Sequence, residues 1–330
     1  MINKKKLSIL IFSNQDNQIM NLQKFHLEKL DHKVNLYQFR GHRNFKKYIE
    51  ILMKIRNLDS TDYDIIHAFF GSSGFIANFQ RNIPVITTFM GSDLLGEYKI
   101  NGKYDYLFSL ITFITSFFAQ ILSKKLISIS KKLSKRIYYN NKHKLIKLGV
   151  DSEHFQPIEM YEARKKLNWD DSILYVLFPA MKKRIIKRYD IAKEIIDKIS
   201  IKHKSIKLIS LDEPNMYPNI PLIMNACNAM IFVSIHEGSP CVVKEAMACN
   251  LPIFSFDIGD VNEYAGHLKP GHVAKNNNKI ELYEKLLLHL SSDPNKRSNG
   301  RTKIEKLSWD IYAIEVEKIY FETLGIDTNA

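Results

Sequence analysis

Short runs of β-branched and aromatic residues recur along the chain, each followed by polar or small residues and then by a stretch with helical spacing. A parallel sheet covered by helices on both faces produces this alternation, because its strands are buried on both sides. Two successive doubly wound, Rossmann-like units account for the whole pattern, and ligands of such units collect beyond the carboxyl ends of the strands. The predicted strands are 7–12, 34–37, 65–69, 85–88, 126–129, 145–148, 173–178, 206–210, 229–233 and 252–255.

The length of 330 residues is enough for two domains. Strand character ends within residues 149–157, so we predict a first domain at 1–157 and a second at 158–308. The three cysteines are an odd number without C-x-x-C spacing, which argues against a disulfide scaffold or a structural zinc site and for a reducing compartment. The basic start before the first strand resembles a signal peptide, but its apolar run stops after six residues, so we interpret it as a lead-in to that strand.

The net charge of +13 favours a negatively charged partner: nucleic acid, an anionic membrane or a phosphorylated small molecule. Between Asp105 and Asp151 there are nine basic residues and no acidic one. Residues 106–123, just before them, are uncharged. Their apolar stripe is Leu107, Leu110, Ile111, Ile114, Phe117, Phe118, Ile121 and Leu122, and opposite it lie Ser109, Thr112, Ser116 and Gln120.

Two interpretations of region 106–147 remain open. It is either a core helix of the first domain followed by a solvated basic helix, or a surface that contacts an anionic membrane without spanning it. The hydroxyl groups make a spanning helix a poor fit.

The segment 224–252 reads as strand, loop, helix and strand. Ser239 is a good N-cap and Pro240 suits the first helical position, so we expect a helix from there to about Cys249. Gly238 permits close approach of the backbone, and the amides at such a helix start attract anions or sugar hydroxyls. Glu237 and Glu245 are eight residues apart, which suits one extended ligand better than a metal cluster. Alternatively they are a surface loop acid and an ordinary helix residue.

A basic loop follows the first strand of the second domain. Among residues 182–188 five are Lys or Arg, including Lys182, Arg184 and Lys187. The alternative to an anion-binding role is a solvated turn.

This pattern resembles the donor-binding signature of family 4 retaining glycosyltransferases of GT-B fold, of the bacterial surface-polysaccharide type. The resemblance rests on residues 225–227, 237–240, 243–249, 251–252 and 257–261 together with Glu263. It implies that Glu237 lies by the transferred sugar, that Glu245 binds the ribose, and that the Gly238 and Ser239 amides contact sugar hydroxyls. Lys187 resembles the lysine of the family's basic pair, and its partner is Arg184 or Lys182. Asp260 and Glu263 have the spacing of a capping box, which we interpret as a helix start.

The first domain resembles the family more diffusely, at 65–68, 84–94, 127–130 and 149–151. On the acceptor side the resemblance points to Asn14, Gly91 and Asp93. Met90 stands where many relatives have a histidine, and the loop 13–18 lacks their paired glycines. We treat His67 as structural. The segment 307–320 resembles the closing helix of the family, which implies that residues 309–330 return to the first domain.

The resemblance therefore implies transfer of a sugar from a UDP- or GDP-sugar, with retention and without a metal ion, to a lipid-linked or polysaccharide acceptor. Such an enzyme would work in the cytoplasm or on the inner face of the membrane. Alternatives are a catalytically silent GT-B subunit that docks on a membrane or a partner glycosyltransferase, and a sugar-nucleotide epimerase on the same fold. Nucleic-acid binding ranks last, because no recognised module accompanies the charge.

Overall fold

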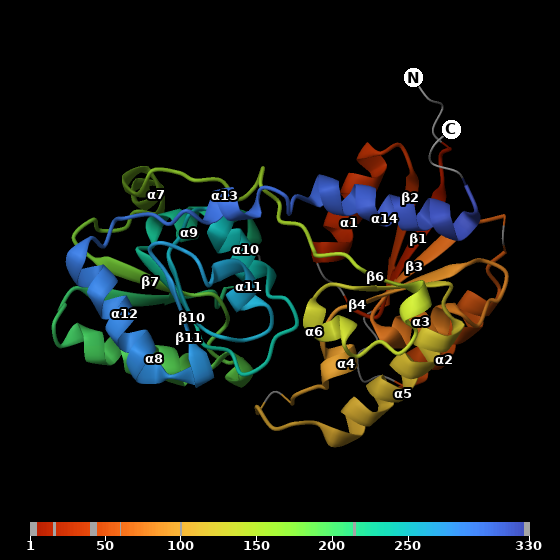
Figure 1. Ribbon diagram of the computed structural model, residues 1–330, viewed down its shortest axis with the longest axis horizontal. Coiled ribbons are helices and arrows are strands. Elements are labelled where there is room, and N and C mark those ends of the chain that lie inside the picture. The colour runs from red at the N-terminus through yellow and green to blue at the C-terminus, as the bar shows by residue number, and fades with distance from the viewer. Residues whose placement is uncertain are drawn as a thin grey trace. The chain divides into compact units, whose positions relative to one another are not determined.

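The computed structural model describes residues 5–15, 18–39, 45–59, 61–99, 101–213 and 216–326, and the chain forms two compact units (Figure 1). The first unit comprises residues 1–97, 104–149 and 309–330, and the second comprises 98–103 and 150–308. Residues 1–4 of the basic lead-in, and Asp16 and Asn17 of the first loop, lie outside the described residues.

The first unit contains a six-stranded parallel sheet in the order β2-β1-β3-β4-β5-β6. The direction of strand addition reverses between β1 and β3, and in doubly wound sheets this switch point is where ligands bind. The strands are β1 (Ser8–Ser13), β2 (Lys33–Gln38), β3 (Ile65–Phe69), β4 (Val85–Phe89), β5 (Lys125–Ser128) and β6 (His143–Leu145).

Helices cover both faces of this sheet: α1 and α14 lie on one, and α2, α3 and α5 on the other (Figure 1). Leu10, Phe12 and Ile66 of the sheet pack with Ile51 and Ile55 of α2 in one hydrophobic cluster. The helices are α1 (Gln18–Lys29), α2 (Phe45–Arg56), α3 (Gly71–Ala77), α4 (Ser92–Leu95), α5 (Tyr106–Leu122), α6 (Lys131–Ser134), the 3₁₀ turn η1 (Asn140–Lys142) and α14 (Trp309–Leu324).

Helix α14 supplies part of the core of the first unit although it comes from the end of the chain. Tyr320 is fully buried, and its hydroxyl lies 2.7 Å from Nδ1 of His67. Nε2 of His32 lies 2.8 Å from Oε1 of Glu317, and both side chains are buried. Burial lowers the pKa of His67 to about 3, so its imidazole is neutral and serves the core.

Helix α5 turns the opposite face to the protein from the one that the core-helix interpretation predicts. All eight residues of its apolar stripe are exposed, whereas Ser109, Thr112, Ser116 and Gln120 on the other side are buried. That interpretation is therefore wrong: Ser109, Ser116 and Gln120 form hydrogen bonds with the rest of the unit, and the apolar side faces outward. Among the described helices, none combines the length and apolar character that a bilayer crossing requires.

The second unit contains a five-stranded parallel sheet in the order β11-β10-β9-β7-β8. Here the switch point lies between β7 and β9. The strands are β7 (Leu174–Phe178), β8 (Ile206–Ser210), β9 (Ala229–Phe232), β10 (Ile253–Phe256) and β11 (His272–Ala274). The helices are α7 (Met160–Leu167), η2 (Ile185–Lys187), α8 (Tyr189–Ser200), η3 (Tyr217–Asn219), α9 (Ile220–Ala226), α10 (Cys241–Ala248), α11 (Val261–Ala265), η4 (Lys275–Asn277), α12 (Lys279–Ser292) and α13 (Gly300–Ile304).

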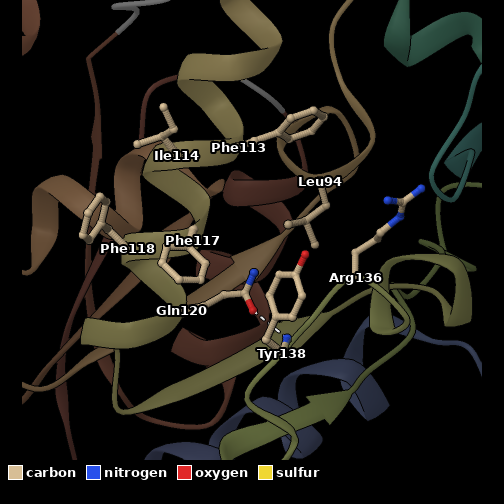
Figure 2. Close-up of a pocket in the computed structure, with 8 residues that line it drawn as sticks. All are labelled: Leu94, Phe113, Ile114, Phe117, Phe118, Gln120, Arg136 and Tyr138. Carbon is tan, nitrogen blue, oxygen red and sulfur yellow. Dashed lines mark hydrogen bonds between the residues drawn. The ribbon is translucent and has the colours of Figure 1, made fainter.

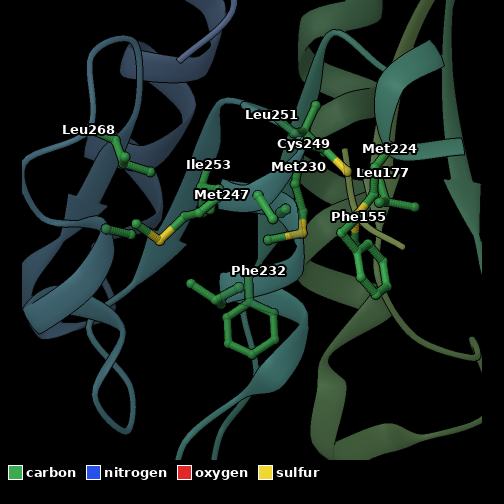
Figure 3. Close-up of a cluster of buried hydrophobic side chains, with 14 of the residues drawn as sticks. Phe155, Leu177, Met224, Met230, Phe232, Met247, Cys249, Leu251, Ile253 and Leu268 are labelled. Atoms are coloured by element: carbon green, nitrogen blue, oxygen red, sulfur yellow. The ribbon is translucent and has the colours of Figure 1, made fainter. Parts of the chain in front are cut away.

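Two hydrophobic clusters fill the two faces of this second sheet. One packs Leu177, Met230 and Ile253 of the strands against α9, α10 and α11, and Figure 3 shows part of it. The other packs Val176 and Ile231 against α8 and α12. Both faces are therefore buried, as the near-continuous apolar strands require.

The two sheets confirm the predicted pair of Rossmann-like units. Each of the ten predicted strands is present, but β6 begins two residues before its predicted range and β11 was missed. β11 is only three residues long, and two of its side chains are half-buried, so it leaves little apolar signal.

Candidate active site

The switch point of the second sheet brings together the two loops that the sequence singled out. The basic loop follows β7, and the loop that contains Glu237 follows β9, the strand beside β7. The amide of Ile235 donates to the carbonyl of Ile186 over 2.8 Å. The ammonium group of Lys187 forms a short ion pair with Oε1 of Glu237. Parallel strands end at one edge, so topology alone places these loops side by side.

The ion pair of Lys187 and Glu237 is largely shielded from solvent, with side-chain exposures of 14% and 15%. The lysine ammonium also lies 5.8 Å from the centroid of the Phe232 ring. Arg188, the next residue, has a φ of 59° and donates to the carboxylate of Asp190. The turn thus directs two neighbouring cations to different places, and Lys187 is the one that reaches the candidate site.

The other predicted basic residues lie elsewhere on the loop. The backbone amide of Lys182 donates to Asp212 over 2.7 Å, and its ammonium group lies 3.4 Å from the same carboxylate, beyond the end of β8. Arg184 precedes η2 and is exposed. The structure therefore joins Lys187 to Glu237 but turns Lys182 toward Asp212.

The turn before α10 is built differently from the predicted cap. Pro240 is the N-cap and the helix begins at Cys241, one residue later than expected. The Ser239 hydroxyl does not cap the helix but accepts a hydrogen bond from the ammonium group of Lys244 over 3.0 Å. Lys244 is almost fully buried and also lies 5.1 Å from the centroid of the Tyr264 ring. A buried ammonium needs acceptors, so it takes the serine hydroxyl that a cap would use.

Glu245 projects from α10 without a side-chain hydrogen bond among the described residues. Burial raises the pKa of its carboxyl to about 7; Lys244 opposes this change and Asp151 adds to it. A carboxylate with this much desolvation and no donor of its own is suited to accept hydrogen bonds from a ligand.

A third loop, after β10, packs against the turn at Glu237 and Gly238. Gly259 has a φ of +67°, and a Cβ atom there would lie 3.2 Å from the carbonyl oxygens of Glu237 and Gly238. Glycine is thus needed both for the backbone angle and for the close approach. Asp260 is the N-cap residue of α11, which confirms the predicted helix start, although its side chain makes no capping bond. Instead, burial raises the pKa of Asp260, while the neighbouring Lys244 and Ser239 lower it.

Of the acceptor-side residues, Asn14 lies at the switch point of the first sheet, and Gly91 and Asp93 follow β4. Asn14 directly follows β1, and its amide nitrogen donates to the hydroxyls of Ser72 (2.9 Å) and Tyr48 (3.0 Å). Its amide oxygen is buried and has no partner among the described residues. Phe70, directly after β3, has a φ of 71°, a strained angle for an aromatic residue. An open acceptor group beside strained backbone is typical of a binding site.

Asp93 connects two loops through hydrogen bonds to their backbone amides. Its buried carboxylate accepts hydrogen bonds from the amides of Gly91 (2.8 Å), Met90 (3.2 Å) and Gly71 (3.2 Å). Burial raises the pKa of Asp93 to about 6, although these three amides lower it. Asp93 therefore orders the loops after β3 and β4, and Gly91 supplies one of the bonds.

Sequence reasoning gave no functional role to Gly259, Lys244, Ser72 or Tyr48. Gly259 lies within the recognised run 257–261, where a glycine directly before Asp260 could have suggested a close approach. Lys244 lies within the recognised run 243–249, and only its burial shows that it holds Ser239. Nothing in the local sequence marks Ser72 or Tyr48 as site residues, because only the fold brings them to Asn14.

Comparison with known proteins gives the class of this chain. Residues 192–306 match the family model described as Glycosyl transferases group 1. The chain is 24% identical over 292 residues, covering 80% of its length, to a protein of Methanocaldococcus jannaschii named "Uncharacterized glycosyltransferase MJ1178", of which the match covers 77%. The second unit thus carries a Glycosyl transferases group 1 domain.

Solved structures give the fold. Sucrose-phosphate synthase from Thermosynechococcus elongatus superimposes with a TM-score of 0.75 at 14% identity, over 97% of this chain and all of that one. Anabaena HepE in complex with UDP and glucose gives a TM-score of 0.67 at 14% identity, over 94% of this chain and 98% of that one. The fold is GT-B, and together with the family match it indicates a glycosyltransferase of the GT-B type.

Proposed function

We propose that this chain is a nucleotide-sugar-dependent glycosyltransferase, related to family 4, that transfers a sugar with retention of configuration. The second unit holds the donor, and the first unit holds a lipid-linked or glycan acceptor near Asn14. The observation that carries the proposal is the ion pair of Lys187 and Glu237 at the switch point of the second sheet. It places a cation and a carboxylate where ligands of doubly wound units bind.

The donor in this proposal is a UDP- or GDP-sugar. Lys187 binds the diphosphate, and Arg184 on the same loop is a second cation for it. Glu245 accepts hydrogen bonds from the ribose hydroxyls. The turn at Gly238 and Ser239 receives the sugar. The complex of Anabaena HepE with UDP and glucose supports this class of donor.

The reaction breaks the bond between the anomeric carbon of the sugar and an oxygen of the diphosphate. Negative charge develops on that oxygen, and the Lys187 ammonium stabilises it without needing to reorganise. Glu237 holds Lys187 in place before the donor arrives and then lies beside the transferred sugar. Departure of the diphosphate and attack of the acceptor on the same face give retention, with the leaving phosphate taking the acceptor proton and no metal ion required.

The test compares Lys187→Ala with Lys183→Ala, which removes an exposed lysine of the same loop. Both variants are titrated with a panel of UDP- and GDP-sugars, and release of nucleoside diphosphate is measured with and without a bacterial lipid extract. Lys187→Ala should lower turnover by about 10²–10³, the usual effect of removing one preorganised charge-stabilising group. Lys183→Ala should behave as wild type. Full activity of Lys187→Ala would refute the site, and failure of the wild-type chain to bind any nucleotide sugar would leave the silent GT-B subunit instead.

A further inference from the structure

Helix α5 presents an extensive apolar surface to the outside of the first unit. Ten of its 17 residues are large apolar or aromatic side chains with exposed surface. Helices of globular proteins normally bury this stripe against the core. The exposed residues are Tyr106, Leu107, Leu110, Ile111, Phe113, Ile114, Phe117, Phe118, Ile121 and Leu122.

The opposite face of α5 is fixed, so the helix cannot turn its apolar side inward. The hydroxyl of Ser116 donates to the carbonyl of Asp93 over 2.9 Å, and that of Ser109 accepts from the amide of Glu97 over 2.8 Å. A Cβ atom on Gly71 would lie 2.7 Å from the Cα atom of Ser116, which shows how closely α3 approaches. Rotation would leave these buried polar groups without partners, at considerable cost.

The apolar surface continues beyond α5 on both sides. At the C-terminal half of the helix, Phe113, Ile114, Phe117 and Phe118 line a pocket of about 410 Å³ with Tyr138 (Figure 2). Toward α2, a second pocket of about 480 Å³ lies between Leu107, Ile111 and the side chains of Ile49 and Leu52. An exposed apolar surface that spans two helices marks a docking site rather than ordinary solvent-facing residues.

Cations border this surface at the C-terminal end of α5. Arg136 lines the same pocket as Phe117 and Tyr138 (Figure 2). The ammonium group of Lys142 donates to the carbonyls of Ile121 and Ser123, 2.8 Å from each, so a positive charge lies where the helix ends. Nine basic residues and no acidic one occur between Asp105 and Asp151 in the sequence, and of these Lys125 and Lys144 form ion pairs with Glu322 of α14.

We propose that α5, with the adjacent face of α2, docks on an anionic bilayer, with the helix in the plane of the interface and its apolar side chains below the head groups. A helix of 17 residues is about 25 Å long, too short to span but long enough to lie along a surface. Aromatic residues beside Arg and Lys suit the boundary between acyl chains and acidic head groups. A second copy would bring the same basic border onto itself, which disfavours pairing through this face. The docking surface stands independently of the proposed sugar transfer.

Flotation of the full chain with phosphatidylcholine vesicles, with and without phosphatidylglycerol, tests the proposal. Wild type should float with the acidic vesicles and be released by salt. The double variant Leu110→Ser, Ile114→Ser should partition at least tenfold less, while Ile201→Ser, which alters an even more exposed apolar residue of the second unit, should float as wild type. Absence of wild-type flotation with acidic vesicles at low salt would overturn the proposal. A dimer in sedimentation that the double variant dissolves would also overturn it, by assigning the face to a second copy.

A second variant keeps the test valid if the double variant folds poorly. Leu110→Trp preserves the apolar character of the face, and its fluorescence should shift to the blue when acidic vesicles are added. Ile201→Trp is the matched control and should show no shift. Equal responses from the two tryptophans would contradict docking through α5.

Discussion

Replacing Glu245 by glutamine should stabilise the ligand-free protein at alkaline pH and weaken nucleotide-sugar binding at the same time. Burial raises the pKa of this carboxyl to about 7, whereas in the unfolded chain it ionises near 4.5. The folded protein therefore holds the proton more tightly than the unfolded chain does. Ionisation of Glu245 lowers the free energy of unfolding as the pH rises from about 4.5, and the loss is complete above pH 7.

The size of the effect follows from the two pKa values. The difference between 4.5 and about 7 corresponds to about 3 kcal/mol of destabilisation above pH 7. Glutamine has the same shape and no charge, so Glu245→Gln should recover much of this amount at pH 8.5 and little at pH 4.5. Binding should move the other way, because a ribose hydroxyl donates more strongly to a carboxylate than to an amide, by about 1–2 kcal/mol per bond.

Urea denaturation at pH 4.5 and 8.5 measures the first effect, and calorimetric titration with a UDP- or GDP-sugar measures the second. A nucleotide sugar is preferable to a free diphosphate, whose terminal phosphate titrates near pH 6. Wild-type affinity should fall about tenfold from pH 8 to pH 6, where about a tenth of Glu245 is ionised, and the variant should lose this dependence. Glu284→Gln, on an exposed part of α12, is the control. A variant that is less stable at pH 8.5 and binds as wild type would refute the reasoning.

Two further changes test the support of the site and the core. Gly259→Ala should cost about 1–2 kcal/mol and lower kcat/KM, because the methyl group displaces the carbonyl of Glu237; Gly325→Ala, at the same φ of +67° but with open space around it, should retain activity. Glu317→Ala should lower the free energy of unfolding by about 3 kcal/mol, because it leaves His32 buried without its partner. Urea denaturation checks both, and a Glu317→Gln variant as unstable as Glu317→Ala would contradict the hydrogen-bond explanation.

The positions of the strands along the chain follow from local sequence, because buried parallel strands are apolar on both faces. The meeting of Lys187 and Glu237 follows from the same pattern, since both come just after strands that neighbour each other in a doubly wound sheet. The end of α10 can also be predicted from the sequence, because Asn250 follows it and adopts the left-handed conformation that asparagine favours.

Other features depend on tertiary context and escape a local rule. Ser239 satisfies the rule for an N-cap, but buried Lys244 takes its hydroxyl. Asp260 has the spacing of a capping box, but its side chain makes no capping bond, and the same Lys244 lowers its pKa against the effect of burial. Periodicity divides α5 into an apolar and a hydroxyl stripe, but it does not say which one faces the protein. The close approach of Gly71 to Ser116 and the hydrogen bonds of Ser109 and Ser116 decide that.

The position of α14 has a consequence for synthesis of the chain. His32 and His67 lie in segments made early, but their partners Glu317 and Tyr320 are made only after the second unit. The first unit is thus completed only after the second unit has all its strands available. A nascent chain that stalls before Trp309 would expose these unfilled core positions to chaperones and proteases.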